Sequence, residues 1–313
     1  MSSTSSSQSS SQSKHGPHQH DALIFLFNAL LIGTAVMHLQ AIYPCLQQTI
    51  ILFILGVLFS LLMEGANLKD HLGVFGESYE MWLDIDPHLL MFTMLPALLA
   101  GDAMSIDTSV ARRVAFQCLY LAGPGVLISA MCTAAFLSLY LDWSFLLSLV
   151  AGAILCATDP VAVVALLKEL GASPMLTVQI QGESLLNDGT AIVLFLIAYN
   201  SLGGQNYDAA DIAMFLVKKA MMAWALGLFI GYIFYSWIRV AGNRLNHGSS
   251  IIQISLTLCC AYWSYIMVEG VLSLSGVLAT VASSLILAHH MWPHIVSPES
   301  LNNVWHTLEA LGN

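Results

Sequence analysis

Charged residues are scarce in this chain. Of its 313 residues, 9% are Asp, Glu, Lys or Arg and 57% are hydrophobic, whereas an ordinary soluble domain has about 25% charged residues. The composition therefore excludes an ordinary soluble domain and indicates a protein embedded in a membrane, with membrane lipid as its surroundings.

Cysteine pairs and an early signal sequence are also lacking. The six cysteines form no CxxC pair, so neither a zinc site nor a disulfide framework is indicated. Residues 1–20 are rich in Ser and Gln, too polar to fold, and too poor in early basic residues to open a secretory signal. We expect a disordered tail over residues 1–20 and a membrane domain over residues 21–313.

Long apolar stretches occupy nearly everything after residue 21. Each is about 20 residues long, which is enough for a helix to cross a hydrocarbon core about 30 Å thick. The fold class expected is all-α, a polytopic membrane protein with about nine transmembrane helices. The predicted spans are 22–42, 48–64, 86–104, 114–140, 144–167, 176–200, 212–238, 250–268 and 270–290. The Gly123-Pro124-Gly125 sequence predicts a kink in the fourth span, because proline removes a backbone donor.

Basic residues between the spans predict the orientation. Arg112 and Arg113 are expected between spans three and four, Lys168 between five and six, and Arg239 between seven and eight. These loops lie on one side, which the positive-inside rule makes cytoplasmic. Lys218 and Lys219, near the start of span seven, do not fit this orientation.

Span five carries an acid next to a helix breaker. Asp159 precedes Pro160 near the middle of the apolar stretch, and ionisable residues within transmembrane helices usually mark ion or proton pathways. Pro160 has no N–H, so the carbonyl of Cys156 loses its helical partner. Transporters use such broken helices as ion sites, and Thr158 adds a hydroxyl at the break.

Span six carries a second group of polar residues at helical spacing, Glu183, Ser184, Asn187 and Asp188. Carboxylate, hydroxyl and carbonyl oxygens suit a hard cation, and Na⁺ fits them better than a transition metal. Burial disfavours the charged form of a carboxylate, so H⁺ and Na⁺ can compete for Asp188. If such a site opens to each side in turn, the result is antiport, not enzyme catalysis, and no cofactor is needed.

Two long motifs carry a resemblance to a known family. They are Ala157-Thr158-Asp159-Pro160-Val161-Ala162-Val163-Val164-Ala165-Leu166-Leu167-Lys168-Glu169-Leu170-Gly171-Ala172-Ser173 and Gly182-Glu183-Ser184-Leu185-Leu186-Asn187-Asp188-Gly189-Thr190. The chain resembles the monovalent cation/proton antiporters, specifically the eukaryotic sodium/proton exchangers, and most closely their plant salt-tolerance and sperm-type branch. The likeness runs from about residue 50 to the last residue.

The resemblance implies a role for each motif residue. Asp188 would bind the ion, Na⁺, and the proton, and Asn187 would brace the broken helix. Ser184 and Thr158 would supply oxygens, and Asp159 would stabilise the crossing of two broken helices. Glu183 would pair with an arginine on a later helix. The resemblance also implies a homodimer formed through the membrane domain, and it favours the plasma membrane. We expect no nucleic acid as a partner.

Two departures from the family pattern stand out. Family members commonly place an acid five residues after the proline of a Leu-Pro motif, but after Pro96 that position is Gly101 and Asp102 follows one residue late. The family's membrane domain also has about thirteen spans in two inverted repeats, whereas nine are expected here. The arginine partner of Glu183 is thus missing, and we expect an incomplete inverted-repeat fold and a fragment of a full exchanger.

Two other functions compete with antiport. A non-transporting membrane subunit or regulator derived from an exchanger is the alternative that the missing spans favour. An intramembrane hydrolase using Asp102, Asp159 and Asp188 is disfavoured, because the chain has no GxSxG motif and a proline directly after Asp159 serves to break a helix.

Overall fold

The computed structural model describes residues 19–43, 48–65, 73–158, 160, 163–164, 166–167, 170–204, 209–242 and 248–312. Every regular element within these ranges is helical, in agreement with the expected all-α class. The chain forms two compact units, Met1–Pro87 and His88–Asn313, and each is described by itself.

The described part of the first unit contains three helices: α1 (Gln19–Ile42), α2 (Gln48–Gly65) and α3 (Val74–Leu83). The backbone N–H of Phe25 on α1 donates to the Ser78 hydroxyl on α3 at 3.0 Å. The Tyr79 ring lies edge-on to Phe59 of α2, with ring centroids 5.6 Å apart. The short helix α3 was not among the expected spans, because 10 residues that include Glu77 and Glu80 form no apolar run.

The second unit holds the other helices that the structure describes. They are α4 (Pro87–Ser105), α5 (Thr108–Tyr120), η2 (Leu121–Gly125), α6 (Val126–Leu141), α7 (Phe145–Leu155), α9 (Pro174–Leu202), α10 (Ala209–Ala241), α11 (Gly248–Tyr265), η3 (Ile266–Val271), α12 (Gly276–His290), η4 (Trp292–His294) and α13 (Pro298–Gly312).

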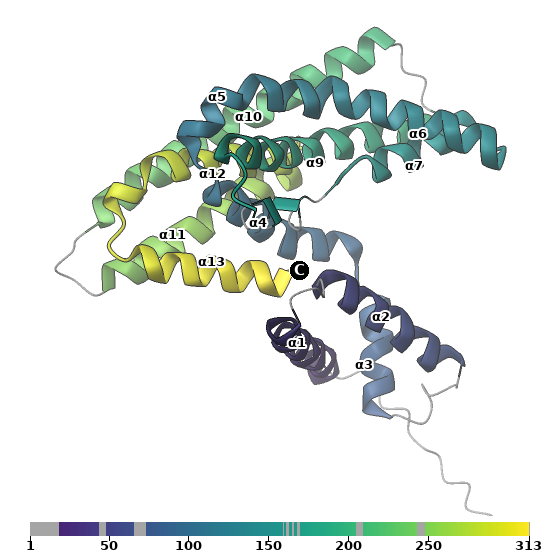
Figure 1. Ribbon diagram of the computed structural model, residues 1–313, viewed down its shortest axis with the longest axis horizontal. Helices are drawn as coiled ribbons and strands as arrows, with labels where there is room; N and C mark the ends of the chain where they lie inside the picture. The colour runs from purple at the N-terminus through teal and green to yellow at the C-terminus, as the bar shows by residue number, and fades with distance from the viewer. Residues whose placement is uncertain are drawn as a thin grey trace, which may run out of the picture. The chain divides into compact units, whose positions relative to one another are not determined.

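Helix α9 lies at the centre of this unit (Figure 1). It packs against α5, η2, α6, α7 and α12. One buried cluster joins Leu185 of α9 to Val114 and Cys118 of α5 and to Val281 of α12. The helix that carries the second motif is therefore enclosed by neighbours on several sides.

Helices α10 and α12 approach each other through small residues. A Cβ atom built on Gly227 would collide with the backbone of Ala279, and one on Gly231 would lie 2.7 Å from the Ser283 carbonyl oxygen. The spacing is Gly-x-x-x-Gly, a pattern that lets helix backbones come close in membranes. No larger side chain fits at these two positions of α10 without moving α12.

Each expected span has a helix in the structure, but the count of nine stays a prediction. Within the described residues, six helices are long and apolar enough to cross a membrane, and the apolar helices Ile50–Gly65, Phe145–Leu155 and Gly276–His290 are shorter. The Gly123-Pro124-Gly125 sequence lies in η2, a π-helical turn that continues α5 into α6.

The placement of Arg112 and Arg113 in a loop was wrong. Both lie on α5, which begins at Thr108 because Asp107 caps it by accepting a hydrogen bond from the Ser109 N–H. The expected tail lies almost wholly outside the described residues, as does Lys168, while α1 begins at Gln19.

Candidate functional site

The expected helix break is present after α7. The helix ends at Leu155, and beyond the break the Val164 N–H donates to the Pro160 carbonyl at 2.8 Å. Between them, Ala157 and Thr158 have no regular structure. Asp159 lies outside the described residues, so its expected role at the crossing stays a prediction.

Asn187 meets the carbonyl that Pro160 leaves without its helical donor. The Nδ2 atom of Asn187 on α9 donates to the carbonyl oxygen of Cys156 at 3.0 Å. Asn187 is only 2% exposed, and a buried carbonyl without a partner is costly. A side chain from the central helix thus replaces the missing backbone donor.

Ser184 makes the parallel contact one helical turn earlier on α9. Its hydroxyl donates to the carbonyl oxygen of Thr158 at 2.9 Å, and the Ser184 side chain is 8% exposed. The hydroxyl oxygen keeps lone pairs with which it can still accept or ligate. Ser184 and Asn187 therefore attach the broken segment to α9 at two of its carbonyls.

One polar atom at this junction has no partner. The Oδ1 atom of Asn187 is buried and, within the described part of the chain, receives no hydrogen bond. Asp188, the next residue, is half-buried. Gly189 follows, and a Cβ atom on it would lie 2.7 Å from the Leu278 side chain of α12. Three consecutive residues thus differ in what they contribute. Within the described part of the chain, Asn187 has an acceptor oxygen that receives no hydrogen bond, Asp188 has a carboxylate, and Gly189 lies close to α12.

Glu183 is half-buried on α9. Among the described residues, no hydrogen bond or ion pair reaches its carboxylate. Its expected arginine partner is not found in this part of the molecule, and the ion pair stays a prediction.

Asp102 lies in the last two turns of α4, where its backbone carbonyl accepts a hydrogen bond from the Ser105 hydroxyl at 2.8 Å. Its participation in the ion site stays a prediction. A Cβ atom on Gly101, the position where the family commonly has an acid, would lie 3.7 Å from the Trp305 ring. The sequence gives no sign of this contact, because nothing local to α4 shows that α13 covers it.

A family model for "Sodium/hydrogen exchanger, transmembrane" matches residues 26–311. The chain belongs to the sodium/hydrogen exchanger family. Its family and its long apolar helices make it an integral membrane protein, as the sequence predicted.

Curated relatives agree with this family. The chain is 37% identical to sodium/hydrogen exchanger 7 of Arabidopsis thaliana over 314 residues, which cover 99% of this chain and 27% of the relative. It is 35% identical to sodium/hydrogen exchanger 8 of the same plant over 94% of this chain and 38% of the relative. The chain thus spans between about a quarter and two fifths of these two exchangers.

A solved structure shows the same fold. The sodium proton antiporter MjNhaP1 from Methanocaldococcus jannaschii aligns with 93% of this chain and 67% of its own, with a TM-score of 0.69 at 18% identity. The antiporter-type fold expected from the resemblance is therefore confirmed, whereas the incomplete inverted repeat stays a prediction.

Proposed function

We propose that this exchanger-family chain carries the cation and proton site of a sodium/proton antiporter, with Asp188 as the group for which Na⁺ and H⁺ compete. The supporting observation is the attachment of the broken segment to α9 by Asn187 and Ser184. Those two contacts place the interrupted backbone beside the helix turn that carries Asp188.

The site has the ligand chemistry that a small hard cation requires. Oxygen atoms come from the Asp188 carboxylate, the Ser184 hydroxyl, the Thr158 hydroxyl and the buried Asn187 amide. Na⁺ is bound by such oxygens without sulfur or imidazole. Asp159 would add a second carboxylate from the broken segment.

Exchange of Na⁺ for H⁺ follows when the Asp188 carboxylate binds either ion but not both at once. A proton on Asp188 removes the charge that attracts Na⁺, and bound Na⁺ disfavours the proton. If the site faces the two sides of the membrane alternately, each turnover carries Na⁺ one way and protons the other. Asn187 and Ser184 contribute by holding the ligand backbone in place while the charge on Asp188 changes.

Proton release on Na⁺ addition tests this competition on the chain itself. The purified chain in detergent, in weakly buffered solution with a pH indicator dye, should release protons when NaCl is added. Asp188→Asn should abolish the release, because an amide does not titrate. Asp142→Asn removes an acid at the exposed C-terminal end of α6 and should leave the release unchanged.

Equal proton release from the Asp188→Asn variant would show that the site is assigned to the wrong residue. Uptake of radioactive Na⁺ by proteoliposomes with an acidic lumen then tests transport separately. Binding without uptake would favour a non-transporting subunit, and uptake would favour a complete exchanger.

Assembly and location are part of the proposal. We expect a homodimer formed through the membrane domain, in the plasma membrane. Chemical cross-linking in native membranes, followed by gel electrophoresis, should yield a band at twice the mass of the chain.

A further inference from the structure

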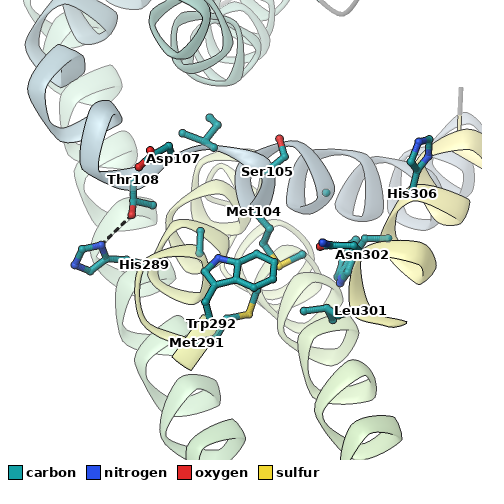
Figure 2. A pocket seen from close by; sticks show the side chains of 14 residues that line it. Met104, Ser105, Asp107, Thr108, His289, Met291, Trp292, Leu301, Asn302 and His306 are labelled. Carbon is teal, nitrogen blue, oxygen red and sulfur yellow. Dashed lines mark hydrogen bonds between the residues drawn. The ribbon is translucent and has the colours of Figure 1, made fainter. Parts of the chain in front are cut away.

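A cavity that neither Asn187 nor Ser184 lines is formed by residues of α4, α5, α12 and α13 and of the short segments between them. Its volume is ≈ 660 Å³, within the usual range for small-molecule sites. It forms where α4 and α12 end and α5 begins, and α13 closes one side. Figure 2 shows Asp107 and Thr108 on one side of the cavity and Asn302 and His306 on the other.

The walls combine aromatic rings and thioethers. Trp292 and Trp305 both line the cavity, together with Met104 and Met291. Figure 2 shows the Trp292 indole beside Met104. Indole faces attract cations more strongly than other aromatic rings do, and methionine sulfur is polarizable enough to pack against a soft charged group.

The local charge also favours a cation. Asp107 is the only ionised acid among the lining residues, and no Lys or Arg lines the cavity. Helices α4 and α12 direct their C-terminal ends here through Ser105 and His289, and helix C-termini carry partial negative charge. The positive N-terminal end of α5 is covered by the Asp107 carboxylate.

The walls are held by contacts between distant helices. The Thr108 hydroxyl of α5 and Nδ1 of His289 of α12 lie 2.9 Å apart, a bond that Figure 2 draws. On the other side, the Trp305 indole N–H donates to the Thr257 hydroxyl of α11 at 3.1 Å. These two bonds fix walls that lie far apart in the sequence, so the cavity is preformed.

The ligand class follows from these walls. A bare metal ion needs several oxygen ligands at short range, but Oδ1 of Asp107 already accepts from both the N–H and the hydroxyl of Ser109. An anion would find no Lys or Arg among the described residues that line the cavity, only the imidazoles of His289 and His306. A quaternary ammonium group needs no hydrogen bonds, only aromatic and polarizable walls with a negative charge nearby.

We propose that this cavity binds a quaternary ammonium group, supplied either by the choline head group of a membrane phospholipid or by free choline. The site lies at the ends of membrane-length helices, where head groups are found. It is independent of Asp188 and of ion exchange.

The test measures binding of radiolabelled choline to the purified full chain in maltoside micelles, which contain no quaternary ammonium. Tetramethylammonium should displace the choline, and NaCl at equal ionic strength should not. Trp292→Leu should weaken binding about tenfold, since a desolvated cation–π contact is worth that much. Asp107→Asn should also weaken it, and it keeps a good helix cap because Asn serves as well as Asp at that position.

Matched controls are Trp237→Leu, an exposed tryptophan on α10, and Asp142→Asn, an exposed acid on α6. Both should bind choline as the unmodified chain does, as should Asp188→Asn. Absence of choline binding that tetramethylammonium displaces overturns the proposal. So does binding that Trp292→Leu and Asp107→Asn leave unchanged. If Trp292→Leu does not fold, Asp107→Asn decides.

Nanodiscs separate the two sources of the ligand. If phosphatidylcholine nanodiscs suppress the binding of free choline and phosphatidylglycerol nanodiscs do not, the lipid head group occupies the site. If both preserve the binding, free choline is the ligand.

Discussion

The side-chain amide of Asn187 donates to the backbone carbonyl of Cys156 at 3.0 Å, 31 residues away in the sequence. Cys156 is the residue whose carbonyl would accept from position 160 in a continuous helix, and position 160 is proline. The polar side chain of Asn187 on α9 therefore satisfies the backbone group that the break after α7 leaves free.

Removing the Asn187 amide should destabilise the chain. Asn187→Ala leaves the Cys156 carbonyl without its partner, which costs about 1–3 kcal/mol when the group is buried. Thermal unfolding of the purified chain should show a lower Tm. Asn200→Ala, at the exposed end of the same helix, should change the Tm little.

Restoring the backbone donor should reduce that cost. Pro160→Ala supplies an N–H that can reach the Cys156 carbonyl, so Asn187→Ala should cost less in this background than in the unmodified chain. The double-mutant cycle measures the difference. Additive effects would show that Asn187 and Pro160 do not share this carbonyl.

The break in the helix after α7, and one of the two side chains that hold it, could be predicted from the sequence. Proline chemistry alone identifies Cys156 as the residue whose carbonyl loses its donor, and the family resemblance assigns the brace to Asn187. That Ser184 donates to the Thr158 carbonyl could not be predicted, because it depends on the register between α9 and the broken segment. Local chemistry shows where a backbone group is freed, but packing decides which side chain reaches it.

Helix boundaries show the same division. Asp107, followed by Thr108 and Ser109, is a residue type favoured at a helix N-cap. Because this cap starts α5 at Thr108, Arg112 and Arg113 are helical. The expected span began only at residue 114, because the first turns of α5 are polar and do not form part of an apolar stretch. The packing of Trp305 against Gly101 could not be predicted from the local sequence, since the two residues lie about 200 positions apart.

The close approach of α10 and α12 should make Gly227 intolerant of any side chain. Gly227→Ala places a methyl group against the Ala279 backbone, and overpacking of this kind costs about 1–3 kcal/mol. The Tm should fall. Gly33→Ala is the matched control, because Gly33 lies in α1 with nothing within 4 Å of its added Cβ, and alanine is the better helix former. An equal change at both positions would contradict the close approach.

Gln253 should be essential to the C-terminal part of the fold. It is 1% exposed, its Nε2 donates to the carbonyls of Ile238 and His294, and its Oε1 accepts from the Val296 N–H. Gln253→Met keeps the volume but leaves three backbone groups unpaired, at about 1–3 kcal/mol for each one that stays buried.

A large loss of thermal stability is therefore expected for Gln253→Met. The control is Gln117→Met, at an exposed position of α5, which should leave the Tm nearly unchanged. Comparable melting curves for the two variants would contradict the role of Gln253 in joining α10 and α11 to the segment after α12.

The cap of α5 should give the chain an acid-dependent component of stability. Hydrogen bonds from the Ser109 hydroxyl and then from its backbone N–H hold the pKa of Asp107 below its ordinary value. A lowered pKa in the folded state means that the stabilisation is complete above the unfolded-state pKa, about 3.9. It is lost as the pH falls through the lower, folded-state value.

The Tm difference between the unmodified chain and Asp107→Ala should therefore be largest near neutral pH and shrink below about pH 4. Asp107→Asn keeps the cap without the charge, so its own difference from Asp107→Ala should not change with pH. A constant difference between the unmodified chain and Asp107→Ala would show that the ionised carboxylate does not cap α5.

The charge of Glu183 should lower the stability of the chain. Its carboxylate is half-buried, and no partner reaches it among the described residues. Removing one member of a buried ion pair costs about 3–5 kcal/mol, because the other charge is left uncompensated. Glu183→Gln removes that charge and should raise the Tm of the 313-residue chain at neutral pH. Glu77→Gln, on α3 in the other unit, serves as the matched control and should leave the Tm nearly unchanged. A lower Tm for Glu183→Gln would mean that the carboxylate already has a stabilising partner, and the expected arginine on a later helix would then be unnecessary.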